Sequence, residues 1–120
     1  MNILIVDDNT DSTMLIKELI KNDNEKVNTN CVDNSSDALK IIKNLKYDLY
    51  LLDYDIDDFL NGYELAKKIK RVNSNAKIFI ITGMEASCIK SEHNDWDSFV
   101  DGIIVKGTPI NKWKIDFKKE

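Results

Sequence analysis

Residues 1–9 read MNILIVDDN, and this stretch decides the fold. Residues 3–6 form an unbroken apolar run of branched side chains closed by polar residues, which is typical of a short strand buried on both faces. Asp7 and Asp8 follow where that strand reaches the surface. Because two adjacent carboxylates repel each other unless something positive shares their site, we expect a cation beside them.

Three further apolar runs end in the same way, at one polar residue. They are residues 49–52 before Asp53, residues 78–81 before Thr82 and residues 103–105 before Lys106. Residues 27–32 instead alternate apolar with polar side chains, a pattern that suits an edge strand.

Apolar residues between these runs recur at helical spacing. We expect helices over residues 12–22, 38–45, 65–72 and 110–117, and a weakly periodic one within 84–100. Asp11 or Ser12 is the expected N-cap of the first helix. Strands and helices thus alternate five times, which predicts an α/β fold with a parallel sheet, right-handed crossovers and helices on both faces.

Length and composition limit the alternatives. A chain of 120 residues fits one domain, here residues 1–120. The formal charge of −4 argues against general binding of nucleic acid or anionic membranes. No apolar run approaches the length of a membrane span and no basic leader opens the chain, so we expect a cytoplasmic location.

The two cysteines, Cys31 and Cys88, have no CxxC spacing and no companion histidine cluster. We interpret them as reduced thiols in or near the core, with a disulfide between them as the alternative.

The polar residues that end the buried runs should converge, because parallel strands finish at one edge of the sheet and ligands bind there. Three carboxylates suit a hard divalent cation such as magnesium, which takes oxygen ligands. A lysine opposite the cation adds a second positive charge that an anion could bridge. Asp53 would then be a nucleophile that accepts a phosphoryl group.

The set Asp7-Asp8, Asp53, Thr82 and Lys106, in this order and at these strand ends, resembles the receiver domain of two-component response regulators. The resemblance spans the whole chain. It implies a doubly wound five-stranded parallel sheet of strand order 2-1-3-4-5, flavodoxin-like, in three α/β/α layers.

The resemblance also implies a role for each site residue. Asp8 would bind Mg2+ directly and Asp7 through water, while Asp53 would be both a metal ligand and the phosphoacceptor. Asp55 would offer its backbone carbonyl to the metal. Thr82 would be the switch hydroxyl, beside the Gly83 N–H, and Lys106 would pair with a phosphoryl oxygen.

The implied partner is a sensor histidine kinase or a histidine phosphotransfer protein. The output would lie in another protein or in a domain C-terminal to this chain, and a homodimer stays open. This domain itself would bind neither nucleic acid nor membrane. The competing hypothesis is a pseudo-receiver, an interaction module that signals without phosphorylation.

The sequence departs from the family pattern in three places. The loop after Asp53 reads YDIDDFLN, without the usual methionine-proline pair and with one extra residue before Gly62. The lysine is followed by glycine instead of proline, so we expect a trans Lys106-Gly107 bond. Ile103 stands where the family often has an aromatic switch residue.

Two other motifs compete for the acidic loop. Counted from Asp53, aspartates at loop positions 1, 3 and 5 and Glu64 at position 12 match part of a calcium-binding EF-hand, but position 6 is Asp58 where that loop needs glycine. Asp53-Tyr54-Asp55 also matches the DxD signature of haloacid-dehalogenase-like phosphatases, whose chains are much longer. We expect His93 to be exposed and without a role in phosphotransfer.

Overall fold

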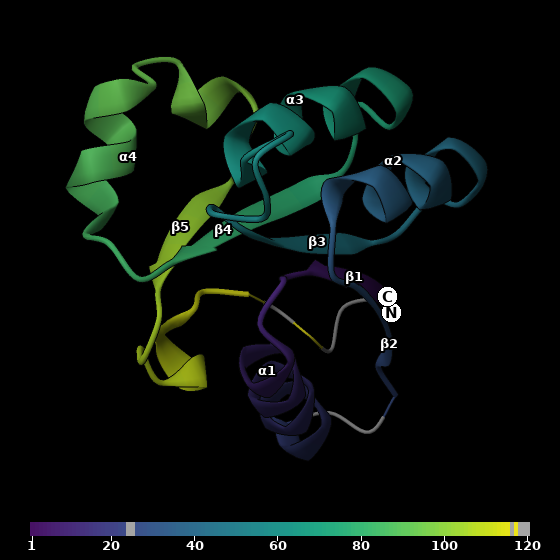
Figure 1. The fold of residues 1–120 in the computed structure, drawn as a ribbon. Helices are drawn as coiled ribbons and strands as arrows, with labels where there is room; N and C mark the ends of the chain where they lie inside the picture. Colours follow the sequence, from purple (N-terminus) through teal and green to yellow (C-terminus); the bar gives the residue numbers. More distant parts are fainter. Residues whose placement is uncertain (24–25, 116, 118–120) are drawn as a thin grey trace.

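A computed structural model describes residues 1–23, 26–115 and 117 of the chain. One parallel sheet has the strand order β2-β1-β3-β4-β5, which confirms the predicted doubly wound topology (Figure 1). Its strands are β1 (Asn2–Val6), β2 (Asn28–Val32), β3 (Leu49–Asp53), β4 (Lys77–Thr82) and β5 (Gly102–Val105). The alternating segment forms β2 and lies at an edge, as predicted.

Helices cover both faces of the sheet. They are α1 (Thr10–Asp23), α2 (Ser35–Asn44), α3 (Gly62–Val72) and α4 (Ala86–Glu92). Figure 1 shows α1 on one side of the sheet and α2, α3 and α4 on the other. The weakly periodic region that follows β4 holds α4 and a separate 3-10 turn, Trp96–Ser98, so only part of it is α-helical.

The two layers of packing follow from the alternation of side chains along the buried strands. Ile3 and Ile5 face the apolar cluster that contains Ile16 and Ile20 of α1. Leu4 and its neighbours on the same side of the sheet pack against α2, α3 and α4. Both faces of β1 are therefore buried, which explains its continuous apolar sequence.

Polar residues fix where the helices begin. Asn9, and not Asp11 or Ser12 as predicted, caps α1, because its side-chain oxygen accepts a hydrogen bond from the Ser12 N–H at 3.0 Å. The α3 helix starts with a reciprocal capping box between Asn61 and Glu64. The start of α3 is thereby fixed despite the unusual loop before it.

The predicted helix over residues 110–117 is wrong where the structure describes it. Only a 3-10 turn, Ile110–Lys112, forms there. The Trp113 indole N–H donates to the Thr108 carbonyl at 2.9 Å, and Lys114 has a φ of 59°. A residue whose backbone is in the left-handed region cannot continue a right-handed α-helix. Residue 116 and residues 118–120 lie outside the described residues.

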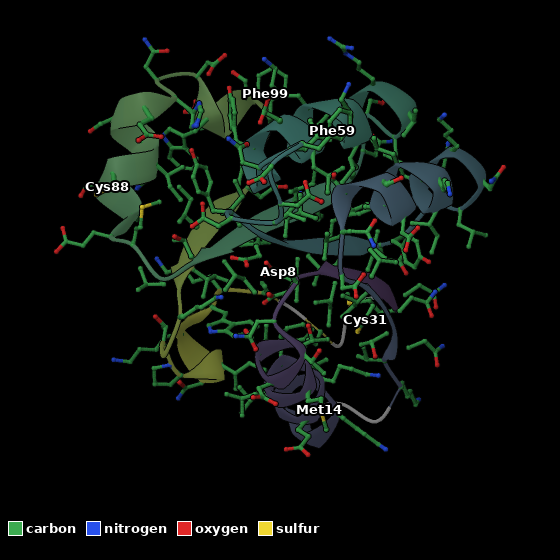
Figure 2. All side chains as sticks on the ribbon, viewed as in Figure 1. Asp8, Met14, Cys31, Phe59, Cys88 and Phe99 are labelled. Atoms are coloured by element: carbon green, nitrogen blue, oxygen red, sulfur yellow. The ribbon has the colours of Figure 1, made fainter. Side chains whose placement is uncertain are left out.

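The cysteines are free, as predicted, but both are exposed, so the expectation of core or near-core thiols is wrong. Cys31 lies on the edge strand β2 and Cys88 on α4, on different sides of the molecule (Figure 2). This separation rules out the alternative of a disulfide between them.

Among the helices that the structure describes, none is both long and apolar enough to cross a bilayer.

Candidate functional site

The carboxyl ends of the strands bring the predicted residues to one edge of the sheet. In chain order, Asp7 follows β1, Asp53 ends β3, Thr82 ends β4 and Lys106 follows β5. The chain reverses its direction of winding between β1 and β3, which are neighbours in the sheet. The aspartates therefore lie at the switch point where open α/β sheets bind their ligands.

Three aspartates form a compact oxygen cluster. Asp7, Asp8 and Asp53 each offer one carboxylate oxygen, and these oxygens all lie within 4.8 Å of one another. Asp7 and Asp53 are buried, at 3% and 6% exposure. Asp8 is exposed, and Figure 2 shows it near the middle of the sheet edge. The cluster is therefore open to solvent on the side of Asp8.

Asp7 has one oxygen with a hydrogen-bond donor and one without. Its Oδ1 accepts from the Asn9 N–H at 2.9 Å, which ties it to the cap of α1. Its Oδ2 is buried and accepts no hydrogen bond within the described part of the chain. A buried carboxylate oxygen without a donor is costly, and a bound cation would satisfy it.

Lys106 supplies the positive charge that the structure shows at the cluster. Its Nζ lies 3.6 Å from Asp53 Oδ1 and 3.9 Å from Asp7 Oδ2. The side chain is 35% exposed, so the ammonium also faces solvent. Lys106 can therefore contact an anion that approaches Asp53 from outside.

A tight turn directs this lysine toward the site. The Thr108 N–H donates to the Val105 carbonyl at 3.0 Å, and Gly107 within the turn has a φ of 93°. Glycine adopts this backbone conformation without a steric penalty. No described peptide bond is cis, which confirms the expected trans Lys106-Gly107 bond.

The environment of Asp53 disfavours its charge. Burial, together with the neighbouring Asp7 and Asp8 charges, raises the pKa of Asp53 to about 7, and Lys106 opposes this rise. The single positive charge of Lys106 does not balance the three carboxylates of the cluster. Added positive charge would restore the ionised Asp53.

Thr82 is buried and its hydroxyl oxygen already has a partner. The side chain is 1% exposed, and Oγ1 accepts from the Met84 N–H at 3.0 Å. Its backbone carbonyl accepts from the Lys106 N–H at 2.7 Å. Thr82 thus connects the ends of β4 and β5 and the start of the segment leading to α4.

The acidic loop after Asp53 folds back onto the strand end. The Gly62 N–H donates to the Tyr54 carbonyl at 2.8 Å, and a Cβ on Gly62 would lie 2.5 Å from the Asp53 carbonyl oxygen. Only glycine fits this close backbone approach. The Asp55 side chain is exposed and is not part of the three-aspartate cluster, so its predicted role stays with its backbone carbonyl.

The EF-hand alternative is wrong for geometric reasons. The Asp57 carboxylate is occupied by hydrogen bonds from Ser35, at 2.7 Å from the N–H and 2.9 Å from the hydroxyl. Glu64 is occupied by the capping box. Asp53 lies in β3, so these residues cannot surround one calcium ion as an EF-hand loop does.

The Asp57 contacts also explain how the loop holds its shape without the methionine-proline pair. Besides Ser35 at the start of α2, Asp57 Oδ1 accepts from the N–H groups of Phe59 and Leu60, at 3.0 and 3.1 Å. This carboxylate therefore ties the loop to a neighbouring helix. The sequence alone offered Asp57 only as position 5 of the EF-hand match, because its partner Ser35 is distant in the sequence.

The prediction that His93 is exposed is wrong. Its side chain is 21% exposed, its ring stacks on the Tyr63 ring with centroids 4.0 Å apart, and its Nε2 lies 2.9 Å from the Tyr54 hydroxyl. Its polar sequence neighbours gave no signal of this packing, because the two tyrosines come from another part of the chain.

The donor set decides which ion the cluster could hold. All the clustered ligands are carboxylate oxygens, which suit a hard divalent cation such as Mg2+. Neither cysteine nor histidine belongs to the cluster, so the soft-ligand sets typical of structural zinc are not present among the described residues. The residues therefore fit a magnesium site.

Comparisons with known proteins agree with this geometry. The family model for the response regulator receiver domain matches residues 3–112. A comparison with curated proteins found no significant match.

Solved structures with the same fold include several response regulators. The response regulator TrrA from Thermotoga maritima, solved in complex with Mg2+ and a beryllium fluoride, is 30% identical, with a TM-score of 0.74 over 89% of this chain and 87% of that chain. A two-component response regulator from Clostridium difficile is 26% identical, with a TM-score of 0.75 over 89% and 84% of the two chains. A CheY-like receiver domain protein from Methanospirillum hungatei is 24% identical, with a TM-score of 0.75 over 88% and 81%.

Proposed function

Because this chain belongs to the response regulator receiver family, we propose that it accepts a phosphoryl group on Asp53 from a phosphohistidine of a partner protein, with Mg2+ as cofactor. The observation that carries the proposal is the set of three clustered aspartates with Lys106 Nζ 3.6 Å from Asp53. The receiver domain would extend over residues 1–120 and act in the cytoplasm.

In the proposed reaction Asp53 is the nucleophile. One of its carboxylate oxygens attacks the phosphorus, the P–N bond to the donor histidine breaks, and the histidine nitrogen keeps the electron pair. Asp8, Asp53 and the Asp55 carbonyl would hold Mg2+, with Asp7 acting through water, and the ion would supply positive charge to the transferring oxygens. The product is an acyl phosphate, and water later attacks its phosphorus, which releases inorganic phosphate and regenerates the Asp53 carboxylate.

Lys106 and Thr82 bind the transferred group. The lysine ammonium already lies between two carboxylates and is partly open to solvent, so it can pair with a phosphoryl oxygen without a large movement. The Thr82 hydroxyl accepts one hydrogen bond, from the Met84 N–H, and it would give up this bond when it rotates to donate its own proton to a phosphoryl oxygen. Closure of both residues on the phosphoryl group would select the active conformer.

The donor protein is a sensor histidine kinase or a histidine phosphotransfer protein, because the nucleophile needs an activated phosphoryl group from outside. The exposed side of the cluster, at Asp8 and Lys106, leaves room for a donor side chain. The output is a partner or a domain C-terminal to this chain.

The pseudo-receiver remains the second candidate because of one observation. Ile103 is apolar and packs against the core cluster of α2, α3 and α4, so it cannot form the hydrogen bond of an aromatic switch residue. The clustered charges argue against this candidate, since holding buried carboxylates together is costly when they carry out no chemistry.

The test is the intact mass of the protein after incubation with acetyl phosphate, with and without Mg2+. We expect one added phosphoryl group on the wild type with Mg2+, none without it, and none on Asp53→Ala. Asp58→Ala is the matched control, since Asp58 is an exposed aspartate of the same loop. An unmodified wild type under quenched, rapid sampling would favour the pseudo-receiver.

A further inference from the structure

The short helix α4 is attached to the proposed acceptor site at both of its ends. Before its first turn, the Met84 N–H donates to Thr82 Oγ1 at 3.0 Å. At its other end, Oε2 of Glu92, the last residue of α4, accepts from the Tyr54 hydroxyl at 2.9 Å, and Nε2 of the next residue, His93, lies 2.9 Å from the Tyr54 hydroxyl oxygen. One attachment thus involves the switch hydroxyl and the other the residue next to Asp53.

The Tyr54 attachment is rigid on the strand side. The Tyr54 N–H donates to the Ile81 carbonyl at 3.0 Å, and its own carbonyl accepts from the Gly62 N–H at 2.8 Å. The residue is 7% exposed. Both backbone groups are therefore hydrogen-bonded to neighbouring elements, and the side chain that carries the hydroxyl is buried.

His93 is held on the helix side by more than one contact. Its ring is stacked on Tyr63 of α3, with an interplanar angle of 20°. Its backbone N–H donates to the Ile89 carbonyl at 3.0 Å. Since the single Tyr54 hydroxyl proton goes to Glu92, the His93 Nε2 must donate to the hydroxyl oxygen. Asp95 accepts a hydrogen bond from the Tyr63 hydroxyl and completes the cluster.

The Thr82 attachment, in contrast, is a single hydrogen bond that the proposed reaction would break. If the Thr82 hydroxyl turns to a phosphoryl group on Asp53, the Met84 N–H loses its acceptor, and the segment leading into α4 becomes free to shift. The Tyr54 attachment involves no atom of the phosphoryl site, so it remains in place. The two ends of α4 should therefore respond differently.

We propose that His93 is a positioning residue that, through Tyr54, holds the C-terminal end of α4 in place, so that α4 turns about this end when Asp53 is phosphorylated. This inference rests on the proposed function. Phosphorylation of Asp53 would then change the position of α4 at the surface without the aromatic switch residue that Ile103 replaces.

The experiment uses beryllofluoride with Mg2+ as the phosphoryl analogue and measures amide hydrogen exchange by NMR. In the wild type we expect the Met84 amide to exchange faster by about fivefold or more on addition of the analogue, while the His93 amide stays protected. In Tyr54→Phe, which lacks the hydroxyl, the analogue should also release the His93 amide.

Matched variants separate positioning from folding. Tyr47→Phe removes another buried tyrosine hydroxyl, one that accepts from Asn30 at 2.7 Å, and should behave as the wild type. His93→Leu removes one of the two contacts of the Tyr54 hydroxyl with the end of α4, so the analogue should release the amide of residue 93, to a smaller extent than in Tyr54→Phe. His93→Gln keeps a donor at the place of Nε2 and should restore the wild-type response.

Three results would overturn the inference. The first is that, in the presence of the analogue, the His93 amide of Tyr54→Phe is as protected from exchange as the His93 amide of the wild type. The second is that the His93 amide of Tyr54→Phe is already unprotected without the analogue. The Tyr54 hydroxyl would then only stabilise the fold, and the release of α4 would not depend on phosphorylation. The third is a wild type that binds no beryllofluoride with Mg2+, which refutes the proposed function itself and removes the basis for the coupling.

Discussion

Asp53 is a buried carboxyl group that must be ionised to act as a nucleophile, and its burial makes the stability of the protein depend on pH. Burial and the Asp7 charge raise the pKa of Asp53 from 3.8 to about 7. The folded state therefore binds a proton that the unfolded state has already released. Its contribution to stability is fully present below pH 3.8 and is lost as the pH rises through about 7.

The variant Asp53→Asn tests this dependence. Without Mg2+ at pH 8, we expect its free energy of unfolding to exceed that of the wild type by about 1–3 kcal/mol, because a repelling buried charge is gone. At pH 4 the difference should nearly vanish. Urea denaturation at the two pH values measures it, and a variant less stable than the wild type at pH 8 would contradict the account.

Gly62 is a second residue whose identity the site requires. A methyl group there would lie 2.5 Å from the Asp53 carbonyl oxygen. We expect Gly62→Ala to lower the free energy of unfolding by about 1–3 kcal/mol, since backbone must shift to admit the added carbon.

Gly83→Ala is the control for this steric effect, because a Cβ at Gly83 meets nothing within 4 Å. Thermal or urea unfolding of both variants makes the comparison. Equal losses of stability in the two variants would show that the close approach of Gly62 to Asp53 has no energetic role.

At the scale of elements, the loop between β3 and α3 depends on Asp57. The Ser35, Phe59 and Leu60 hydrogen bonds lower the pKa of the Asp57 carboxyl, with the Ser35 N–H as the main cause. The loop is thereby tied to the start of α2, and its shape determines where the Asp55 carbonyl lies.

Asp57→Ala removes these bonds and should lower the free energy of unfolding by about 1 kcal/mol at pH 7. A depressed carboxyl pKa stabilises the fold above the ordinary value of 3.8, and this contribution is lost as the pH falls through the folded-state pKa. The difference between variant and wild type should therefore shrink toward pH 3.

The neighbouring variant Asp58→Ala provides the comparison, because both side chains are exposed acids of the same loop. Guanidinium unfolding at several pH values measures all three proteins. If Asp57→Ala and Asp58→Ala are equally stable at pH 7, the carboxylate does not hold the loop to α2.

At the scale of the whole molecule, the sheet and the position of the site could be predicted from the sequence. Four strands, β1, β3, β4 and β5, have continuous apolar runs that each end at a polar residue, and parallel strands bring those ends together. Asp7, Asp53, Thr82 and Lys106 therefore lie where the pattern predicted, as the ends of β1, β3, β4 and β5 show.

Contacts between distant segments could not be predicted in this way. The Asp57–Ser35 bonds and the packing of His93 on Tyr63 join residues that are far apart in the sequence, and the periodicity of a segment does not indicate which distant residue it contacts. The end of the chain was mispredicted for a related reason. Trp113 has helical spacing from Ile110, but its indole bonds to Thr108 and the backbone of Lys114 turns into the left-handed region.

Identification of the modified residue tests directly whether Asp53 is the phosphoacceptor. The protein would be incubated with acetyl phosphate and Mg2+, reduced with borohydride, which converts an aspartyl phosphate to homoserine, and mapped by peptide mass spectrometry. The account predicts homoserine at position 53 and only when Mg2+ is present. A phosphoryl group on His93 or on an aspartate other than Asp53, or no modification of the wild type, would contradict it.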